Sequence, residues 1–227
     1  MKKFQNLITI ATVLALILIL TLTSCSKDSK DETKPVEPEF ELKGIVTTLA
    51  GSSAGDVDGV GELAKFFGPL GMCTDENGNI YVVDTNNNKI KKISPSGVVT
   101  TFAGSTQGDL DSVNPLNAKF YSPRDICRDS QGNFYITDSG NNKIKKISKI
   151  GGVSTINTSS INFNKIFSIC LDNSDNLYVS DIYNTTYRFT KIIKITPNGI
   201  ISYFVGSTNS QDLRLAADMC FDKDNNL

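Results

Sequence analysis

One passage occurs twice in the chain, 54 residues apart, and this repetition constrains the fold more than any other feature. The first copy reads NGNIYVVDTNNNKIKKIS from position 77, and the second reads QGNFYITDSGNNKIKKIS at 131–148. A repeat of this spacing, rich in β-branched and aromatic residues, predicts stacked units of one supersecondary structure. It indicates an architecture and leaves the molecular target open.

Two weaker copies follow the pair. NSDNLYVSD at 173–181 and KIIKITPNG at 191–199 form a third unit, and MCFDKDNNL at 219–227 begins a fourth. A cysteine occurs in the same place of every unit, within Met/Ile-Cys-x-Asp: Cys73, Cys127, Cys170 and Cys220. The shared position fixes the register of the four copies and predicts one structural role for these thiols.

Each complete unit contains four short apolar stretches separated by turn residues. The strands expected in the first unit are Leu70–Thr74, Ile80–Asp84, Lys89–Ile93 and Val98–Ala103. Those expected in the second are Asp125–Arg128, Phe134–Thr137, Lys143–Ser148 and Val153–Asn157. Gly, Asn and Asp between them supply positive φ and cap their own backbone, so we expect hairpin turns.

Four antiparallel strands per unit form the blade of a β-propeller, an all-β fold. The pattern Gly/Asn-[Ile/Phe/Leu]-Tyr-Val/Ile-x-Asp-x-x-x-Asn-x-Ile-x-x-Ile resembles the NHL repeat, and the resemblance covers 44–227. It implies NHL-type four-stranded blades, about three and a half of them in this chain. One departure is that Lys89 and Lys143 stand where the family usually has Arg.

The sequence ends at Leu227 in the middle of a repeat, where earlier copies continue with Tyr-Val-x-Asp. Propellers close with about four to eight blades, and the resemblance implies that six are common. We therefore expect this sequence to be an incomplete propeller, part of a longer product or a truncated frame.

The N-terminus has the pattern of an export signal. Lys2 and Lys3 precede an uncharged, mostly apolar run that ends in Leu-Thr-Ser before Cys25. This run resembles a bacterial lipobox, which implies cleavage of a signal peptide at 1–24 and lipid on Cys25. The alternative is an uncleaved transmembrane helix, because about 18 apolar residues nearly span a bilayer.

The stretch at 25–42 is charged and contains Pro, so it predicts a flexible tether ahead of the propeller at 43–227. The residues that follow Cys25 resemble those of exported bacterial lipoproteins. By that analogy we expect the protein on the outer membrane, displayed at the cell surface. The membrane contact would be made through the N-terminal lipid.

The repeat cysteines fall on the expected inner strand of each blade, which we expect to be apolar nearly throughout. Export permits disulfides, but sheets pack about 10 Å apart and a disulfide needs Cα atoms within about 7 Å. A Cys₄ metal site fails for the same reason. The pattern therefore favours free, buried thiols.

Composition narrows the chemistry. The chain has no His and a formal charge of −1, so it lacks the commonest general base and offers no basic surface for nucleic acid. Asp75 and Asp84 recur at equivalent places in each unit, which predicts turn-forming rather than catalytic roles. We therefore expect no catalytic residue, no metal and no cofactor in this chain.

Length differences between the units concentrate on one face of the expected propeller, where loops on a rigid scaffold commonly bind ligands. The candidate binding-face residues are Asp56, Asp58, Asp109, Asp111, Tyr183, Tyr187 and Arg188. The alternative is that these loops tolerate changes in length and have no functional role. The paired Asp residues could also hold Ca²⁺, although the spacing of an EF-hand is absent.

These observations favour a lipid-anchored, extracytoplasmic, non-catalytic propeller that binds a protein or a glycan. One alternative is a metal-dependent hydrolase, lactonase or lyase of the six-bladed class. That alternative requires channel-facing Glu, Asp or Asn residues that break the repeat. We expect none in the blades present here, so its site would lie partly in missing blades. A structural role in surface assembly or adhesion is the remaining alternative.

Overall fold

The computed structural model describes residues 44–227, apart from 185–188 and 207–216. Val46–Leu227 form one compact unit, and Met1–Ile45 are assigned to another. The expected signal peptide at 1–24, the tether at 25–42, Cys25, Tyr187 and Arg188 lie outside the described residues. All contacts below lie within the Val46–Leu227 unit.

The first blade is an antiparallel sheet of four consecutive strands with a short fifth strand added at its outer edge. The four are β2 (Pro69–Thr74), β3 (Ile80–Asp84), β4 (Lys89–Ile93) and β5 (Val98–Ala103). The added strand, β1 (Gly59–Val60), pairs with β5 and gives the order β1-β5-β4-β3-β2. The long connection before the blade therefore folds back over the blade's outer edge.

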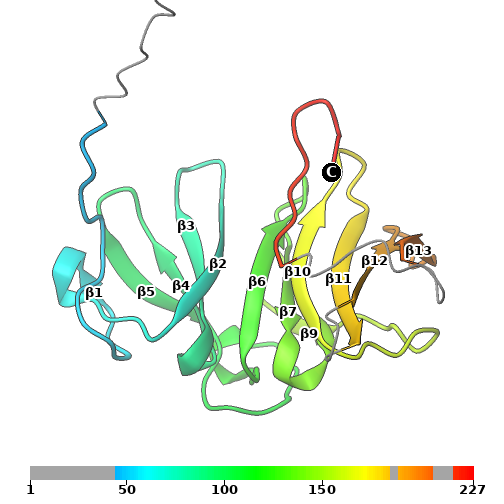
Figure 1. Cartoon of the computed structure of the whole chain (residues 1–227). Helices are drawn as coiled ribbons and strands as arrows, with labels where there is room; N and C mark the ends of the chain where they lie inside the picture. The colour runs from blue at the N-terminus through cyan, green and yellow to red at the C-terminus, as the bar shows by residue number, and fades with distance from the viewer. Residues whose placement is uncertain (1–43, 185–188, 207–216) are drawn as a thin grey trace, which may run out of the picture. The chain divides into compact units, whose positions relative to one another are not determined.

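The second and third blades are four-stranded meanders (Figure 1). The second comprises β6 (Pro123–Arg128), β7 (Phe134–Asp138), β8 (Lys143–Ile147) and β9 (Val153–Thr155). The third comprises β10 (Ile166–Leu171), β11 (Leu177–Asn184), β12 (Phe189–Ile195) and β13 (Ile201–Val205). The helical segments among the described residues are single 3₁₀ turns: η1 (Gly61–Leu63), η2 (Thr85–Asn87), η3 (Pro115–Asn117) and η4 (Ser139–Asn141). The predicted blade architecture is confirmed.

The turns form for the expected reason. Asp75 accepts hydrogen bonds from the backbone N–H groups of Asn77 (3.0 Å) and Asn79 (2.9 Å), and from the Tyr81 hydroxyl (3.2 Å). Asp129 and Asp172 make equivalent bonds in the next two blades. These repeated carboxylates hold hairpin turns, so their predicted structural role is confirmed.

The main core lies between consecutive blades. One cluster joins the first and second blades, with Val83, Ile90, Phe120, Ile136 and Ile147 fully buried. A second cluster joins the second and third blades. Because the facing sides of consecutive blades are apolar and cover each other, burial of side chains between sheets is the dominant stabilising contribution.

The inner strands differ from expectation. Each of β2, β6 and β10 contains a β-bulge at the same place, after its first residue, and a bulge redirects side chains. The bulged residues include Arg124 and Asp125 on β6, and β2 leaves Leu70 and Met72 about half or more exposed, at 50% and 64%. The expectation of nearly uniform apolar inner strands is therefore wrong at the bulge.

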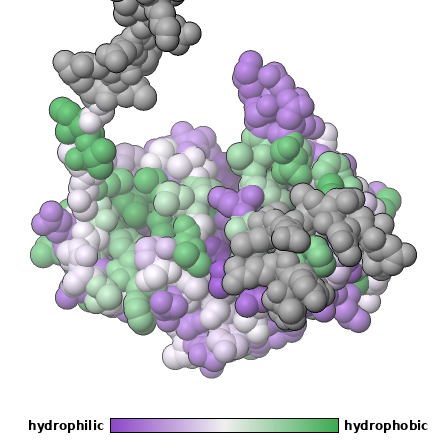
Figure 2. Space-filling view, in the orientation of Figure 1, coloured by the Kyte–Doolittle hydropathy of each residue, from purple (hydrophilic) through white to green (hydrophobic). Residues whose placement is uncertain are grey.

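Hydrophobic side chains also gather on the surface of the first blade, and the C-terminal turn is hydrophilic (Figure 2). Exposed apolar residues of the first blade and its connection include Val60, Leu63, Phe67, Leu70 and Met72. Within the part of the chain that the structure describes, no helix has the length and hydropathy needed to cross a membrane.

Candidate functional site

The first pair of predicted loop carboxylates is engaged by lysines of the following blade. Lys91, whose side chain is 1% exposed, donates to Asp56 (2.7 Å), to Asp58 (2.7 Å) and to the Thr101 hydroxyl (3.0 Å). Lys89 pairs with the other oxygen of Asp56. The Asp58 carboxylate in turn accepts from the Thr101 backbone N–H at 2.8 Å.

The same arrangement recurs in the second blade, and we call each instance an Asp–Lys clamp. Lys145 donates to Asp109 (2.6 Å), Asp111 (2.8 Å) and the Thr155 hydroxyl (2.8 Å), while Lys143 pairs with Asp109. The clamp residues are Asp56, Asp58, Lys89, Lys91 and Thr101 in the first blade and Asp109, Asp111, Lys143, Lys145 and Thr155 in the second.

The clamps pin the connecting loop to the blade. The Asn87 amide donates to the carbonyl of Gly55 (2.8 Å) and to Asp84 (2.7 Å), so loop and hairpin are joined beside the lysines. Burial raises the pKa of Asp56, but the hydrogen bonds and charges of Lys89 and Lys91 outweigh burial and leave that pKa below its ordinary value. These carboxylates already have cationic partners, which accounts for the paired Asp pattern without Ca²⁺.

The third blade has no such clamp among its described residues. Strand pairing shows the equivalence: Lys91 pairs with Thr101 on β5, Lys145 with Thr155 on β9, and Ile193 with Tyr203 on β13. Ile and Tyr thus replace the buried Lys and the Thr. The connection before this blade, 158–163, contains no Asp, so both halves of the clamp are absent together.

An aromatic and cationic cluster takes its place, formed by Tyr183, Phe189, Lys191 and Tyr203; we call it the third-blade cluster. Lys191 Nζ lies 4.5 Å from the ring centroid of Tyr183 and 5.4 Å from that of Tyr203. Tyr183 stacks on Phe189 with centroids 6.1 Å apart. Tyr203 is 46% exposed.

The third-blade cluster stands on lengthened strands. β11 extends to Asn184 and β12 begins at Phe189, where the other blades have a short 3₁₀ turn. The structure thus places Tyr183 on a paired strand, while the predicted partners Tyr187 and Arg188 lie outside the described residues. Sequence reasoning missed Lys191 and Tyr203. The signal for Tyr203 is the change from the Thr of the other two blades, whereas Lys191 keeps the residue type of Lys89 and Lys143.

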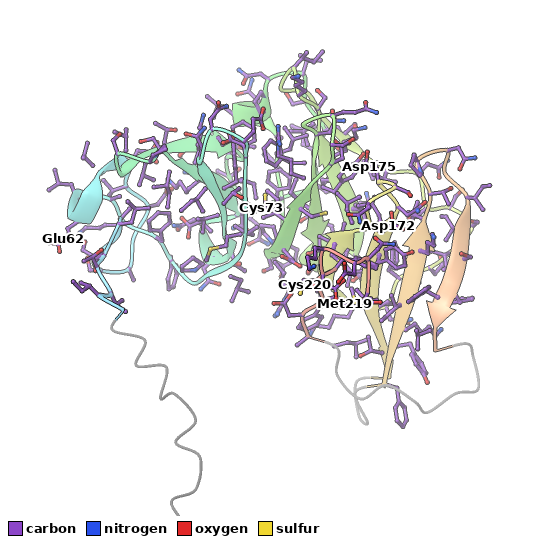
Figure 3. The ribbon with its side chains drawn as sticks, turned by 90° about the horizontal axis from the view of Figure 1, so that it is seen from above. Glu62, Cys73, Asp172, Asp175, Met219 and Cys220 are labelled. Atoms are coloured by element: carbon purple, nitrogen blue, oxygen red, sulfur yellow. The ribbon has the colours of Figure 1, made fainter. Side chains whose placement is uncertain are left out.

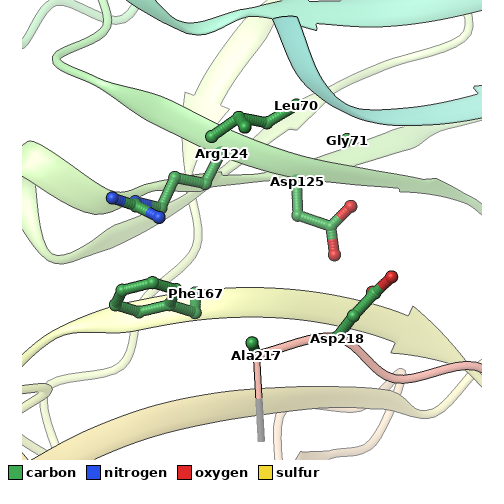
Figure 4. A pocket seen from close by; sticks show the side chains of 7 residues that line it. All are labelled: Leu70, Gly71, Arg124, Asp125, Phe167, Ala217 and Asp218. Carbon is green, nitrogen blue, oxygen red and sulfur yellow. The ribbon is translucent and has the colours of Figure 1, made fainter. Parts of the chain in front are cut away.

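The inner-strand bulges bring together further residues that sequence reasoning missed. Arg124, Asp125 and Asp218 line a cavity of about 270 Å³ (Figure 4). The prediction that no inner acidic residue breaks the repeat is therefore wrong, because Gly71 and Ser168 occupy the positions equivalent to Asp125 in the neighbouring strands.

The repeat cysteines are free, as predicted, but the predicted burial is complete only for Cys170: Cys73 and Cys127 are partly buried, and for Cys220, which is exposed, the prediction is wrong. Cys73, Cys127, Cys170 and Cys220 are free cysteines, and Figure 3 labels two of them, Cys73 on the first blade and Cys220 on the C-terminal segment. Burial raises the pKa of the Cys73 and Cys170 thiols to about 12. In the described ranges, no group of three or more His, Cys, Asp or Glu side chains is arranged to hold a metal ion.

Comparisons with known proteins agree with this architecture. A family model described as the NHL repeat matches residues 66–93 and 120–147. The chain is 39% identical over 136 residues to "NHL repeat-containing protein 2" of Homo sapiens. The matched region covers 54% of this chain and 18% of that protein. It is 32% identical over 94 residues to "Protein SUPPRESSOR OF QUENCHING 1, chloroplastic" of Arabidopsis thaliana, covering 41% of this chain and 9% of that protein.

Among solved structures, "Streptogramin B lyase structure" matches with a TM-score of 0.50 and 21% identity, covering 70% of this chain and 46% of that one. This likeness is one of fold. The chain spans less than a fifth of the length of the two curated relatives above. The repeated blades, their family-model matches and these relatives together identify the chain as an NHL-repeat protein with a β-propeller fold.

Proposed function

We propose that this chain is a non-catalytic binding scaffold, lipid-anchored outside the cytoplasmic membrane through Cys25, that binds a protein or a glycan through its third-blade cluster. The NHL-repeat fold supports an interaction role in general. The export pattern of the N-terminus supports the anchor, the outer-membrane location and display on the cell surface.

The observation that carries the proposal is the replacement of a clamp by the third-blade cluster. In the first two blades the lysines equivalent to Lys191 are Lys89 and Lys143, and each pairs with a loop carboxylate, Asp56 or Asp109. In the third blade, Lys191 and the half-exposed Tyr203 present a cation beside aromatic rings at the same face. Tyrosine provides a rigid apolar surface with a polar tip, a combination enriched in binding surfaces.

The test compares binding by the wild-type chain and Tyr203→Thr, which restores the residue type of the other two blades. Ile200→Thr is the matched control, since Ile200 lies just before β13, is 60% exposed and lies outside the cluster. Binding would be measured to a glycan array and, by cross-linking and mass spectrometry, to surface proteins of the source cell. We expect Tyr203→Thr to weaken the captured interaction at least about tenfold, equivalent to roughly 1.4 kcal/mol.

Equal binding by both variants and the wild type would refute the assignment to the third blade. The anchor is tested separately: Cys25→Ala should abolish incorporation of a fatty-acid label and release the protein from the membrane fraction. Retained label in Cys25→Ala would refute the lipid anchor and leave the binding proposal standing.

A further inference from the structure

The cavity at the inner strands is built from the residues that the bulges redirect. Arg124 and Asp125 follow the first residue of β6, Leu70 and Gly71 follow that of β2, and the register of both strands shifts at these points. The full lining is Leu70, Gly71, Arg124, Asp125, Phe167, Ala217 and Asp218. One apolar side, one cation and two carboxylates therefore face a common space (Figure 4).

These positions do not repeat. The residues that each blade needs for its own turns recur in every unit, as Asp84, Asp138 and Asp181 do. The bulge position instead holds Gly71, Asp125, Ser168 and Asp218, and the position before it holds Leu, Arg, Phe and Ala. Blade formation alone therefore does not account for the residues that line the cavity.

Arg124 is the cation of the cavity. Its guanidinium carbon lies 4.1 Å from the ring centroid of Phe167, and none of the ion pairs between described residues includes it. Burial lowers its pKa, yet a guanidinium stays charged in proteins. A partly buried Arg with aromatic support and no carboxylate partner is suited to bind an anion with fork geometry.

Asp125 is already satisfied and serves as a link between blades. It accepts from the Ser168 hydroxyl (2.8 Å), from the backbone N–H of Ile169 (2.8 Å) and from its own neighbour Ile126 (2.8 Å). Its position also requires Gly71, since a Cβ there would lie 2.6 Å from the Asp125 Cα and 2.8 Å from the Arg124 carbonyl oxygen.

Asp218 is the carboxylate of the cavity that can still accept a hydrogen bond. One of its oxygens accepts from the Met219 N–H (2.9 Å) and lies 3.1 Å from the Ser168 hydroxyl. That hydroxyl has a single proton, and its contact to Asp125 is the shorter one, at 2.8 Å. No described group donates to the second oxygen of Asp218, which leaves an acceptor for a hydroxyl or an amine.

We infer that this cavity binds a small organic acid that carries a hydrogen-bond donor close to its carboxylate. The carboxylate pairs with Arg124, and a hydroxyl or ammonium group of the ligand donates to Asp218. Leu70 and Phe167 contact its apolar part. This site is distinct from the third-blade cluster and does not depend on the proposed function.

The test is calorimetric titration of the full chain with L-lactate, D-glucuronate and L-serine. The methyl ester of each acid is the control ligand, and D-glucose is a second control for D-glucuronate. We expect saturable binding of at least one acid and at least about tenfold weaker binding of its ester. Arg124→Met should weaken that acid at least about tenfold, and Asp218→Asn should weaken it several-fold.

The matched control is Lys165→Met, because Lys165 Nζ also lies over the Phe167 ring, at 5.5 Å, but does not line the cavity. The affinity of Lys165→Met for the acid should stay within about twofold of that of the wild type.

Circular dichroism checks that each variant folds. Arg124→Lys provides a second variant, which keeps the positive charge but lacks the forked guanidinium. The inference is overturned if none of the three acids binds, or if Arg124→Met and Lys165→Met bind equally well. Tyr203→Thr should leave acid binding unchanged.

Discussion

The Asp–Lys clamp of the second blade makes a quantitative prediction through Lys145. This side chain is 1% exposed and donates to Asp109, Asp111 and Thr155 at 2.6, 2.8 and 2.8 Å. Replacement by Met keeps an apolar side chain in the buried position but removes all three hydrogen bonds. It also leaves two carboxylates close together without their shared cation.

Each hydrogen bond to a charged group is worth about 1.5–3 kcal/mol. The carboxylates of Asp109 and Asp111 are 34% and 45% exposed, so water replaces part of what is lost. We therefore expect Lys145→Met to lower the free energy of unfolding by about 2–3 kcal/mol, below the roughly 3–5 kcal/mol of a fully buried broken pair.

Urea denaturation followed by circular dichroism measures this change. Lys146→Met is the control: none of the ion pairs between described residues includes Lys146, and its Nζ lies 5.2 Å from the centroid of the Tyr135 ring. Its replacement should cost less than about 1 kcal/mol. Adding Asp109→Asn to Lys145→Met should lower the free energy of unfolding little further, since the two residues belong to one interaction. Equal stability of Lys145→Met and Lys146→Met would refute the clamp as a stabilising device.

Three further predictions concern the same fold. Burial raises the pKa of Asp138 to about 6, so the folded state binds more protons than the unfolded state between about pH 4 and 6. This group's contribution to stability therefore falls as pH rises through that window. The unfolding free energy of the wild type should fall more steeply with rising pH than that of Asp138→Asn, and identical slopes would contradict the raised pKa. Gly104 has φ +97°, and a Cβ there would lie 2.6 Å from the Asn88 carbonyl oxygen, whereas Gly199 has φ +83° and no atom within 4 Å of such a Cβ. Gly104→Ala should therefore lower the melting temperature clearly more than Gly199→Ala. Similar losses in both variants would show that the contact with the Asn88 carbonyl does not limit the residue at 104. In the folded protein, a thiol reagent with peptide mapping should modify the exposed Cys220 first, the partly buried Cys73 and Cys127 more slowly and the buried Cys170 last. Labelling of Cys170 as fast as Cys220 would contradict this order of exposure.

The blade architecture could be predicted because its signals are local. Turn residues such as Asp75 and Gly78 bound each strand, and the predicted Ile80–Asp84 and Lys89–Ile93 agree with β3 and β4 residue for residue. The third blade differs from the other two in the lengths of its middle strands, β11 and β12.

The partners of the loop carboxylates could not be predicted by the same reasoning. Asp56 and Lys91 are 35 residues apart, and their contact depends on the path of the connection over the blade. A signal was nevertheless present: Asp-x-Asp and Lys-x-Lys occur together in two units, and both are absent from the third unit. The bulges in the inner strands have no comparable signal. Asp125 is therefore expected at the start of an apolar strand, and Arg124, which lies on β6 in the structure, falls outside the predicted strand.

The proposed role of the third blade can be measured most directly by site-specific photo-crosslinking. A benzophenone amino acid would replace Tyr203, and in separate variants the equivalent residues Thr155 and Thr101, with the chain expressed in its source cell. The account predicts a cross-linked protein or glycan from position 203 and none from 155 or 101, which lie within the clamps. Equal cross-linking from all three positions, or cross-linking from 155 or 101 alone, would contradict it.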